Sequence, residues 1–434
     1  IFCCNNNSDH TYVRIILSWN LIQCDATESI DMHVLYIIPE EFNGSRWGGV
    51  TTYVTEAASE LLRYGHTVSV LTPGGREKLY AYKGIRIYNI VTHANGVFTR
   101  IFLSPFRVIF PHLYAVLIWA MSVRRFVLAH DGIDIIETPE WGASALLLGF
   151  IRRPAVVVRL HRSWYQYVSD NRFPFDWSNV LINILECISV IAASAVSSPT
   201  VFMSKQHPVV NAALGFRGIH IHVIENAVAK SSVRKQRNTI KRPYILTVGR
   251  VEIGKGSVML VKAFLRVADI FPELALMYVG EDTEMFLEKK WQSCQSYIRR
   301  LSEAAGKQER VIFIGRIERR ALAAYYRNCL FYVAPSRGYE NPSMAVLEAL
   351  SFGKSIVASD AGGIPEFVTH KKNGLVFRQD DVGSLVSALR TMIKNYAMRN
   401  TCEQRAKQTQ ISLTLTVLKT LGLYSTLLHS RSVA

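Results

Sequence analysis

The stretch from Tyr244 to Ser257, YILTVGRVEIGKGS, decides the fold. Residues 244–249 form a β-prone apolar run that ends at a glycine, and Arg250 and Lys255 follow in the loop before a helical pattern. Such a strand, loop and helix is the repeating unit of a doubly wound α/β domain. Because a helix begins with unpaired N–H groups and the positive end of its dipole, this loop is suited to bind an anion. The stretch therefore predicts a phosphate site at the edge of a parallel sheet.

The same loop almost matches the phosphate loop of nucleotide triphosphatases, G-x-x-x-x-G-K-[ST]. Gly249, Gly254 and Lys255 have the required spacing, but Gly256 stands where a hydroxyl must hold magnesium. The aspartate-ending strand that such enzymes also need is approximated only by SIVASD, which ends at Asp360. A triphosphatase is therefore disfavoured. Arg250 and Lys255 are instead predicted to bracket a diphosphate, the alternative being two cations on a solvated loop.

Outward from this stretch, short β-rich runs alternate with helical patterns in both directions, which predicts an α/β fold with two successive parallel sheets. The first set of predicted strands is 33–39, 67–72, 85–90, 133–138, 155–160, 194–198 and 219–224. The second set is 244–249, 275–280, 311–315, 330–335, 355–359 and 374–377. A ligand cleft is expected at the carboxyl ends of these strands.

The predicted boundaries follow composition. Residues 1–31 lack the basic start and apolar core of a signal peptide, and Met32 directly precedes a strand, so 1–31 is interpreted as extraneous or as a disordered arm. A Rossmann-like domain, 32–226, is followed by the basic, apolar-poor linker 227–243. The second Rossmann-like domain is 244–395. The basic tail 396–434 is interpreted as a helix that returns to the first domain or as a weakly patterned extension.

Composition narrows the class of partner. The 434 residues are 49% hydrophobic and 19% charged, which is typical of a globular enzyme, and the formal net charge is +16. This charge favours an anionic partner, but by itself it does not distinguish nucleic acid, an acidic membrane or a phosphorylated substrate. The seven cysteines form no C-x-x-C pair and no metal-like cluster, which indicates a reducing compartment.

Two glutamates form the next candidate constellation. Glu340 stands after the predicted strand 330–335, and Glu348 follows within an apolar helical pattern, roughly 12 Å away if the chain between them is helical. Because the carboxylates of a glycosidase lie within about 10 Å of each other, these two are better suited to different parts of one extended ligand. Glu348 would bind ribose hydroxyls, or it would pair with an Arg or Lys of the core.

Glycine pairs and one histidine complete the candidates. Gly48 and Gly49 precede a helical pattern, and Gly362 and Gly363 begin GGIPE, where the backbone can approach a ligand closely. His161 ends a predicted strand and so lies at the expected edge of the cleft. Each of these features taken alone also fits an ordinary turn or a structural histidine.

Together the stretches resemble the retaining GT-B glycosyltransferases of glycosyltransferase family 4. Three family motifs occur in order: G-R-x-x-x-x-K-G at 249–256, E-x7-E at 340–348 and G-G-x-P-E at 362–366. The resemblance extends from Met32 to about Tyr396 and is strongest over 244–377. It departs from the family at 341–343, where Asn-Pro-Ser replaces the frequent G-F-G, and at 225–228, where ENAV replaces P-N-G-V-D.

The resemblance implies a role for each motif residue. Arg250 and Lys255 would hold the donor diphosphate, Glu348 the ribose, and Glu340 would face the transferred sugar. His161 would approach the other face of the sugar. The backbone around the diphosphate and sugar would come from the following residues: Gly48, Gly49, Asn341, Pro342, Ser343, Met344, Gly362 and Gly363.

The implied reaction is transfer of a sugar from a UDP- or GDP-sugar to the hydroxyl of a glycan, polysaccharide or lipid-linked acceptor. The anomeric configuration is kept by front-face displacement, in which the departing diphosphate helps to deprotonate the acceptor. No D-x-D motif is present, and Arg250 with Lys255 would serve in place of a metal, so no metal or other cofactor is expected. The alternatives are a sugar-nucleotide epimerase of the same fold and a basic nucleic-acid-binding module, although no RNA-binding aromatic pattern is evident.

The location predicted on these grounds is cytoplasmic, with or without peripheral contact on the inner face of an anionic membrane. The apolar stretch Phe98–Val127, with four interspersed arginines, would lie in the membrane interface or form an ordinary core helix. No run in the sequence reaches the roughly 20 apolar residues of a spanning helix.

Overall fold

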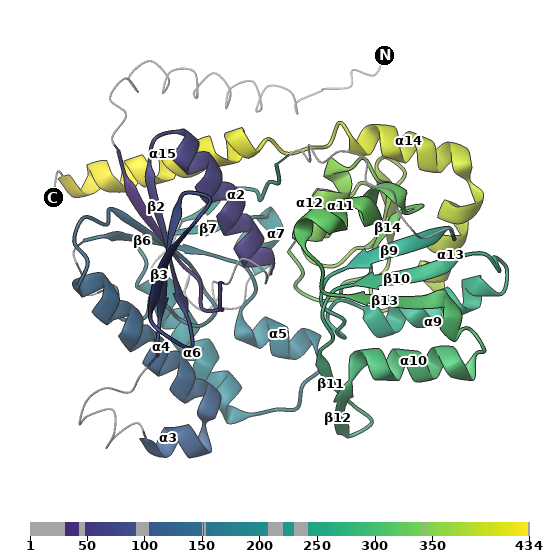
Figure 1. Cartoon of the computed structure of the whole chain (residues 1–434), viewed down its shortest axis with the longest axis horizontal. Coiled ribbons are helices and arrows are strands. Elements are labelled where there is room, and N and C mark those ends of the chain that lie inside the picture. Colours follow the sequence, from purple (N-terminus) through teal and green to yellow (C-terminus); the bar gives the residue numbers. More distant parts are fainter. Residues whose placement is uncertain are drawn as a thin grey trace, which may run out of the picture.

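The computed structural model describes residues 31–42, 48–92, 104–149, 151, 153–206, 220–229, 242–341 and 343–432. These residues form two α/β domains that lie side by side, each built on its own sheet (Figure 1). The predicted N-terminal segment 1–31, apart from Asp31, lies outside the described residues, and so does the linker from residue 230 to 241.

The first domain has an eight-stranded sheet in the order β3-β4-β2-β1-β5-β6-β7-β8, parallel except that β3 runs antiparallel to β4. Its strands are β1 His33–Ile37, β2 Thr67–Pro73, β3 Lys78–Tyr82, β4 Ile85–Ile90, β5 Ile135–Pro139, β6 Ala155–Arg159, β7 Ala195–Ser198 and β8 Ile221–Val223. Its helices are α2 Gly49–Arg63, α3 Ser104–Ile109, α4 Pro111–Leu128, α5 Trp164–Asp170, α6 Trp177–Ile191 and α7 Val201–Gln206.

The second domain has a six-stranded parallel sheet in the order β13-β10-β9-β14-β15-β16. Its strands are β9 Tyr244–Val248, β10 Ala275–Val279, β13 Val311–Gly315, β14 Tyr332–Ala334, β15 Ile356–Ser359 and β16 Gly374–Phe377. Its helices are α9 Ser257–Ala268, α10 Cys294–Ala304, α11 Arg319–Asn328, α12 Met344–Ser351 and α13 Val382–Lys394, with short 3-10 turns at Gln308–Arg310 and Ile364–Glu366.

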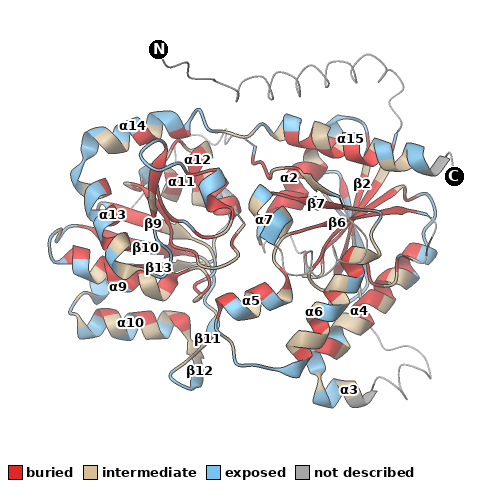
Figure 2. Cartoon of the chain, turned by 180° about the vertical axis from the view of Figure 1, so that it is seen from behind, coloured by how far each residue is buried: buried red, intermediate tan, exposed pale blue. Residues whose placement is uncertain are grey.

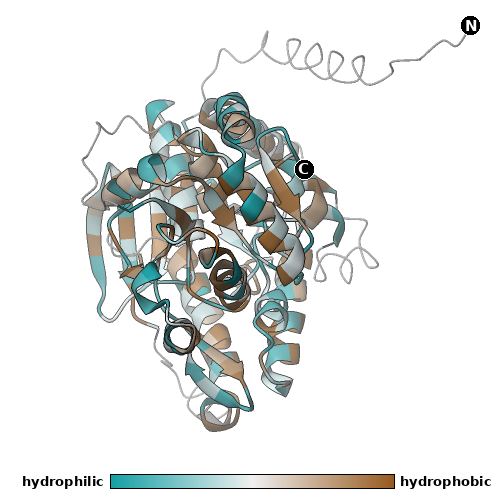
Figure 3. Ribbon diagram, turned by 90° about the vertical axis from the view of Figure 1, so that its right-hand side faces the viewer, coloured by the Kyte–Doolittle hydropathy of each residue, from teal (hydrophilic) through white to brown (hydrophobic). Residues whose placement is uncertain are grey.

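The predicted α/β class, with two doubly wound sheets, is confirmed. Strands such as β6 and β10 are buried over their whole length, as expected when helices cover both faces of a parallel sheet (Figure 2). Apolar residues accordingly gather on the strands and the inner helix faces (Figure 3). In each sheet the chain order reverses beside the first strand, β1 or β9, so the carboxyl ends of both strands are the expected ligand positions.

The sequence analysis missed three strands. β3 lies at the edge of its sheet, where Lys78 and Leu79 are exposed, so it lacks a buried apolar run. The other two, β11 Glu284–Leu287 and β12 Lys290–Ser293, form a hairpin outside the main sheets, with Glu288 and Lys289 both at positive φ in its turn. Each strand of the hairpin has only four residues, and β12 and the turn are polar apart from Trp291, so the sequence gives little strand signal.

The tail forms α14 Tyr396–Ala406 and α15 Leu413–Ser432, and α15 crosses back to lie along the first domain (Figure 1). It packs against α2. The Tyr424 hydroxyl donates a 2.6 Å hydrogen bond to the buried Glu137 carboxylate, and Lys419 lies 2.7 Å from Glu225. The two domains are therefore joined by the C-terminal helices as well as through the 227–243 segment.

The apolar stretch Phe98–Val127 lies partly outside the described residues and otherwise forms α3 and most of α4. Helix α4 packs against α6 and buries a row of apolar side chains that includes Ile118, Trp119 and Val123. The core-helix alternative therefore holds for α4, whereas Val108 and Ile109 at the end of α3 are exposed. None of the helices within the described ranges is long and apolar enough to cross a membrane. Contact with a membrane surface stays a prediction.

Candidate active site

The loop after β9 has a positive φ, which favours glycine, at two positions. Gly249 has φ +138° and Gly256 has φ +70°, and α9 begins directly after Gly256. A Cβ atom at Gly256 would lie 1.8 Å from the Pro335 carbonyl oxygen. The residue that breaks the phosphate-loop pattern is therefore required for close packing against the neighbouring loop.

Lys255 and Glu340 meet within this packing. The Lys255 Nζ lies 2.6 Å from Glu340 Oε1, and the Glu340 side chain is almost fully buried. The glycine pair holds the Glu340 backbone from the other side: Gly363 N donates to the Glu340 carbonyl at 2.8 Å, and a Cβ at Gly362 would lie 1.9 Å from that oxygen. Three separate motifs thus converge on Glu340.

Arg250 lies in the same loop and remains accessible, with 46% of its side chain exposed. Its Nε lies 3.3 Å from the buried carboxylate of Glu252, and its guanidinium lies 4.9 Å from the ring centroid of Tyr167, which belongs to the first domain. Arg250 therefore lies where the two domains contact each other.

His161 brings the first domain to the Glu340 loop. Its backbone N–H donates to both carboxylate oxygens of Glu140, at 2.9 and 2.8 Å, and its carbonyl accepts a hydrogen bond from the Asn341 amide. Its ring packs edge-on against Tyr53. Burial lowers the pKa of His161 to about 4, assisted by Arg159 and opposed by Glu140. The imidazole is therefore neutral near pH 7.

The neutral state of His161 has a consequence for stability. His161 binds a proton near pH 6.5 in the unfolded chain and only near pH 4 in the folded protein. The contribution of the neutral His161 to the free energy of unfolding is therefore complete above pH 6.5 and is lost as the pH falls towards 4. We expect His161→Gln to show a stability deficit that shrinks by on the order of 1 kcal/mol between pH 7 and pH 5. Urea denaturation at both pH values measures it, and an unchanged deficit would contradict the assignment of a neutral histidine.

The other glycine pair starts α2. Gly48 is the N-cap residue, and a Cβ there would lie 2.8 Å from Glu40 Oε1. A Cβ at Gly49 would lie 4.0 Å from the Met344 side chain, which starts α12 after Ser343. The amino ends of α2 and α12, one from each domain, therefore lie next to each other, and the binding of an anion there stays a prediction. Pro342 lies outside the described residues.

Glu348 does not join this cluster. Its Oε1 lies 3.3 Å from Arg319 Nε, and its Oε2 accepts a 3.1 Å hydrogen bond from Tyr326. Arg319 also pairs with Glu56 on α2, so it links the domains. Burial raises the pKa of Glu348, against the opposing effect of Arg319. The structure thus shows a pairing with an arginine, although Arg319 is half-buried between the domains and not part of a core, and the predicted contact with ribose stays a prediction.

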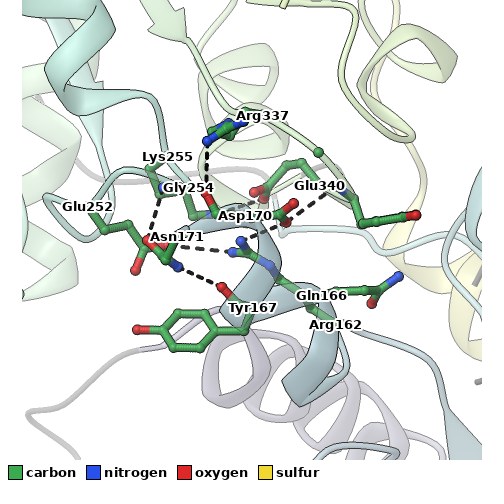
Figure 4. Close-up of polar contacts among 12 residues, drawn as sticks. Arg162, Gln166, Tyr167, Asp170, Asn171, Glu252, Gly254, Lys255, Arg337 and Glu340 are labelled. Atoms are coloured by element: carbon green, nitrogen blue, oxygen red, sulfur yellow. Dashed lines mark hydrogen bonds and ion pairs between the residues drawn. The ribbon is translucent and has the colours of Figure 1, made fainter. Parts of the chain in front are cut away.

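The sequence analysis missed the contribution of α5 and the residues beside it (Figure 4). Asp170 accepts hydrogen bonds from Arg162, at 2.7 Å, and from the backbone N–H of Tyr339, at 3.3 Å. Asn171 accepts from Gly254 N at 3.0 Å. A first-domain helix is thereby bonded to both second-domain loops of the cluster. No motif marks these residues, and their role depends on how the two domains meet.

Glu366, the last residue of the G-G-x-P-E motif, also bridges the domains. Its carboxylate accepts hydrogen bonds from Val201 N and Phe202 N, at 2.9 and 2.7 Å, at the start of α7.

Within the described ranges, no group of three or more histidine, cysteine, aspartate or glutamate side chains is placed to hold a metal ion.

The two facing α/β domains have the GT-B fold of glycosyltransferases. The family model for family 4 glycosyltransferases matches residues 47–232, and the model for group 1 glycosyl transferases matches residues 230–409. The chain belongs to glycosyltransferase family 4, and it is a transferase.

Known relatives agree with this assignment. A GDP-mannose-dependent alpha-(1-6)-phosphatidylinositol monomannoside mannosyltransferase of Mycobacterium tuberculosis is 24% identical over 80% of this chain and 86% of its own length. An uncharacterized glycosyltransferase of Haemophilus influenzae is 30% identical, but the match covers 35% of this chain and only 39% of that protein. The solved structure of HepE from Anabaena, in complex with UDP and glucose, superposes with a TM-score of 0.66 over 91% of this chain and 99% of its own, at 18% identity, which shows a shared fold.

Proposed function

We propose that the protein transfers a sugar from a UDP- or GDP-sugar to an acceptor hydroxyl with retention of configuration. One observation carries the proposal. At the carboxyl ends of the strands, Lys255 contacts Glu340, the next residue after Glu340 bonds to the His161 carbonyl, and the exposed Arg250 lies in the same loop as Lys255. The departing diphosphate carries the developing charge of the reaction. Fixed cations and helix amino ends that face it stabilise the transition state more than the ground state.

In this proposal Arg250 and Lys255 bind the diphosphate. When the diphosphate replaces Glu340 as the partner of Lys255, the Glu340 carboxylate faces the sugar. The neutral His161 contacts the sugar from the first domain without adding a positive charge. Neither glutamate is required as a covalent nucleophile, because the diphosphate oxygen that leaves on one face of the sugar accepts the proton of the acceptor hydroxyl on that same face. Arg250 and Lys255 supply the positive charge, so we expect transfer to continue in the presence of EDTA.

The name of the Mycobacterium tuberculosis relative includes GDP-mannose, which supports a nucleotide-sugar donor. It also includes a phosphatidylinositol mannoside, so lipid-linked acceptors should be tested beside glycans and polysaccharides. The epimerase alternative needs no acceptor, and the nucleic-acid-binding alternative needs no donor. The acceptor screen therefore includes a reaction with donor alone, in which an epimerase would still convert the sugar.

The experiment is a thermal-stabilisation screen of the full chain with UDP-sugars, GDP-sugars, UDP and GDP, followed by transfer assays with whichever donor raises the melting temperature. We expect one nucleotide series to stabilise the protein and the Lys255→Ala variant to respond less. If no nucleotide sugar or nucleoside diphosphate stabilises the wild type, the proposed function is wrong. If the variant responds equally, the site is wrong.

A further inference from the structure

Helix α5 packs against α6 of its own domain and also contacts the second domain, through Asp170 and the following Asn171. It follows His161 and begins with a capping box, in which Gln166 N donates to Ser163 Oγ at 3.3 Å and Ser163 N donates to Gln166 Oε1 at 2.9 Å. Both orphan donors at this end are thereby satisfied, which fixes where a short helix starts. The aromatic ring of Tyr167 is consequently set at a defined position on the helix surface.

The ring of Tyr167 is held from its own domain. It packs against Trp164, with the ring centroids 5.5 Å apart, and edge-on against Phe173, with the centroids 5.7 Å apart. The guanidinium of Arg162 lies 5.4 Å from the ring centroid. The carboxyl end of the helix is anchored too, because Asn171 Nδ2 donates to the Tyr167 carbonyl while Asn171 Oδ1 accepts from Gly254 N (Figure 4).

Arg250 is the residue of the second domain whose guanidinium lies over this ring, 4.9 Å from its centroid. Its Nε also lies 3.3 Å from the Glu252 carboxylate, and nearly half of the side chain is exposed. An exposed arginine on a loop loses considerable rotamer freedom when it binds an anion, and a face-on aromatic ring reduces that loss by holding the guanidinium in place.

We propose that Tyr167 is a positioning residue for the donor site: its ring, supplied by the first domain, holds Arg250 of the second domain in the orientation that binds the donor diphosphate. The inference rests on the proposed function, because it takes Arg250 as a diphosphate ligand. It adds that the cation clamp is complete only when α5 is in contact with the β9 loop. Binding of the diphosphate and approach of the two domains are thereby coupled through one ring.

The test compares Tyr167→Leu, which removes the aromatic face, with Tyr167→Phe, which keeps it. Tyr165→Leu is the matched control, since Tyr165 lies on the same helix and is exposed. UDP and GDP are titrated calorimetrically, and kcat and KM are measured with the donor that stabilises the wild type. We expect Tyr167→Leu to weaken diphosphate binding and raise the donor KM about 3- to 30-fold, and the other two variants to stay within about threefold of wild type.

A double-mutant cycle with Arg250→Ala separates positioning from general damage to the fold. In the Arg250→Ala background, Tyr167→Leu should cause no further loss of diphosphate affinity. The inference is overturned if the two losses are additive, or if Tyr167→Phe is as damaging as Tyr167→Leu. If Arg250→Ala itself leaves UDP and GDP binding unchanged, or if neither nucleotide binds the wild type, the proposed function fails and the inference with it. If Arg250→Ala weakens the binding of UDP or GDP and Tyr167→Leu does not, the inference is rejected and the proposed function is not.

Discussion

Replacing Lys255 with alanine is expected to lower kcat/KM for sugar transfer by about 10²- to 10³-fold, the usual cost of removing one preorganised group that faces developing negative charge. The substitution also leaves the Glu340 carboxylate, which Lys255 contacts at 2.6 Å, buried without its cation. An unpaired buried charge is expected to shift or to take up a proton. The fall in kcat/KM should therefore be far larger than the fall caused by replacing an exposed lysine.

Lys262→Ala provides the comparison. Lys262 lies on α9, which starts two residues after Lys255, and is exposed. Initial rates over a range of donor concentrations, with acceptor in excess, give kcat and KM for both variants, and urea denaturation shows whether either has lost stability. Equal activities of the two lysine variants would remove Lys255 from the reaction. A fall in kcat at a nearly unchanged donor KM would place its main contribution in the transition state.

Much of this site could be predicted because it lies at fixed positions in the α/β repeat. The carboxyl ends of β9 and β14 are set by apolar runs and glycines, and the structure brings Lys255 and Glu340, which follow these strands, into contact, with Arg250 in the same loop as Lys255. Whether they bind a donor is a matter for the experiments above.

The contacts between the domains could not be predicted in this way. Glu348 was predicted to bind a ribose or to pair with an Arg or Lys of the core, and neither alternative indicated that its partner Arg319 also pairs with Glu56, 263 residues earlier in the chain. The ring of Tyr167 likewise meets Arg250 only because the two domains face each other. Hydrophobic periodicity reports which face of an element is buried within its own domain, and it carries no information on such a junction.

Gly256 is the position where the sequence and the structure together make the sharpest prediction. The substitution Gly256→Ser completes the phosphate-loop pattern G-x-x-x-x-G-K-S, so a reading based on the motif alone predicts a gain of magnesium-dependent triphosphatase activity. We expect the reverse, a less stable protein with no such activity. At φ +70° a side chain is strained by about 1–2 kcal/mol, and its Cβ would lie 1.8 Å from the Pro335 carbonyl oxygen, so forced movement of that loop adds about 1–3 kcal/mol.

Gly306→Ser separates the cost of backbone strain from the cost of moving the Pro335 loop. Gly306 has a similar φ of +65°, but no atom lies within 4 Å of the position that its Cβ would take. It should therefore show the strain of the left-handed backbone alone, and the free energy of unfolding in urea should fall further in Gly256→Ser by the cost of the Pro335 contact. Because the Pro335 loop leads to Glu340, transfer activity should fall in the Gly256 variant and persist in the Gly306 variant. Equal stabilities would show that the loop yields freely, and hydrolysis of ATP or GTP that depends on magnesium would restore the triphosphatase interpretation.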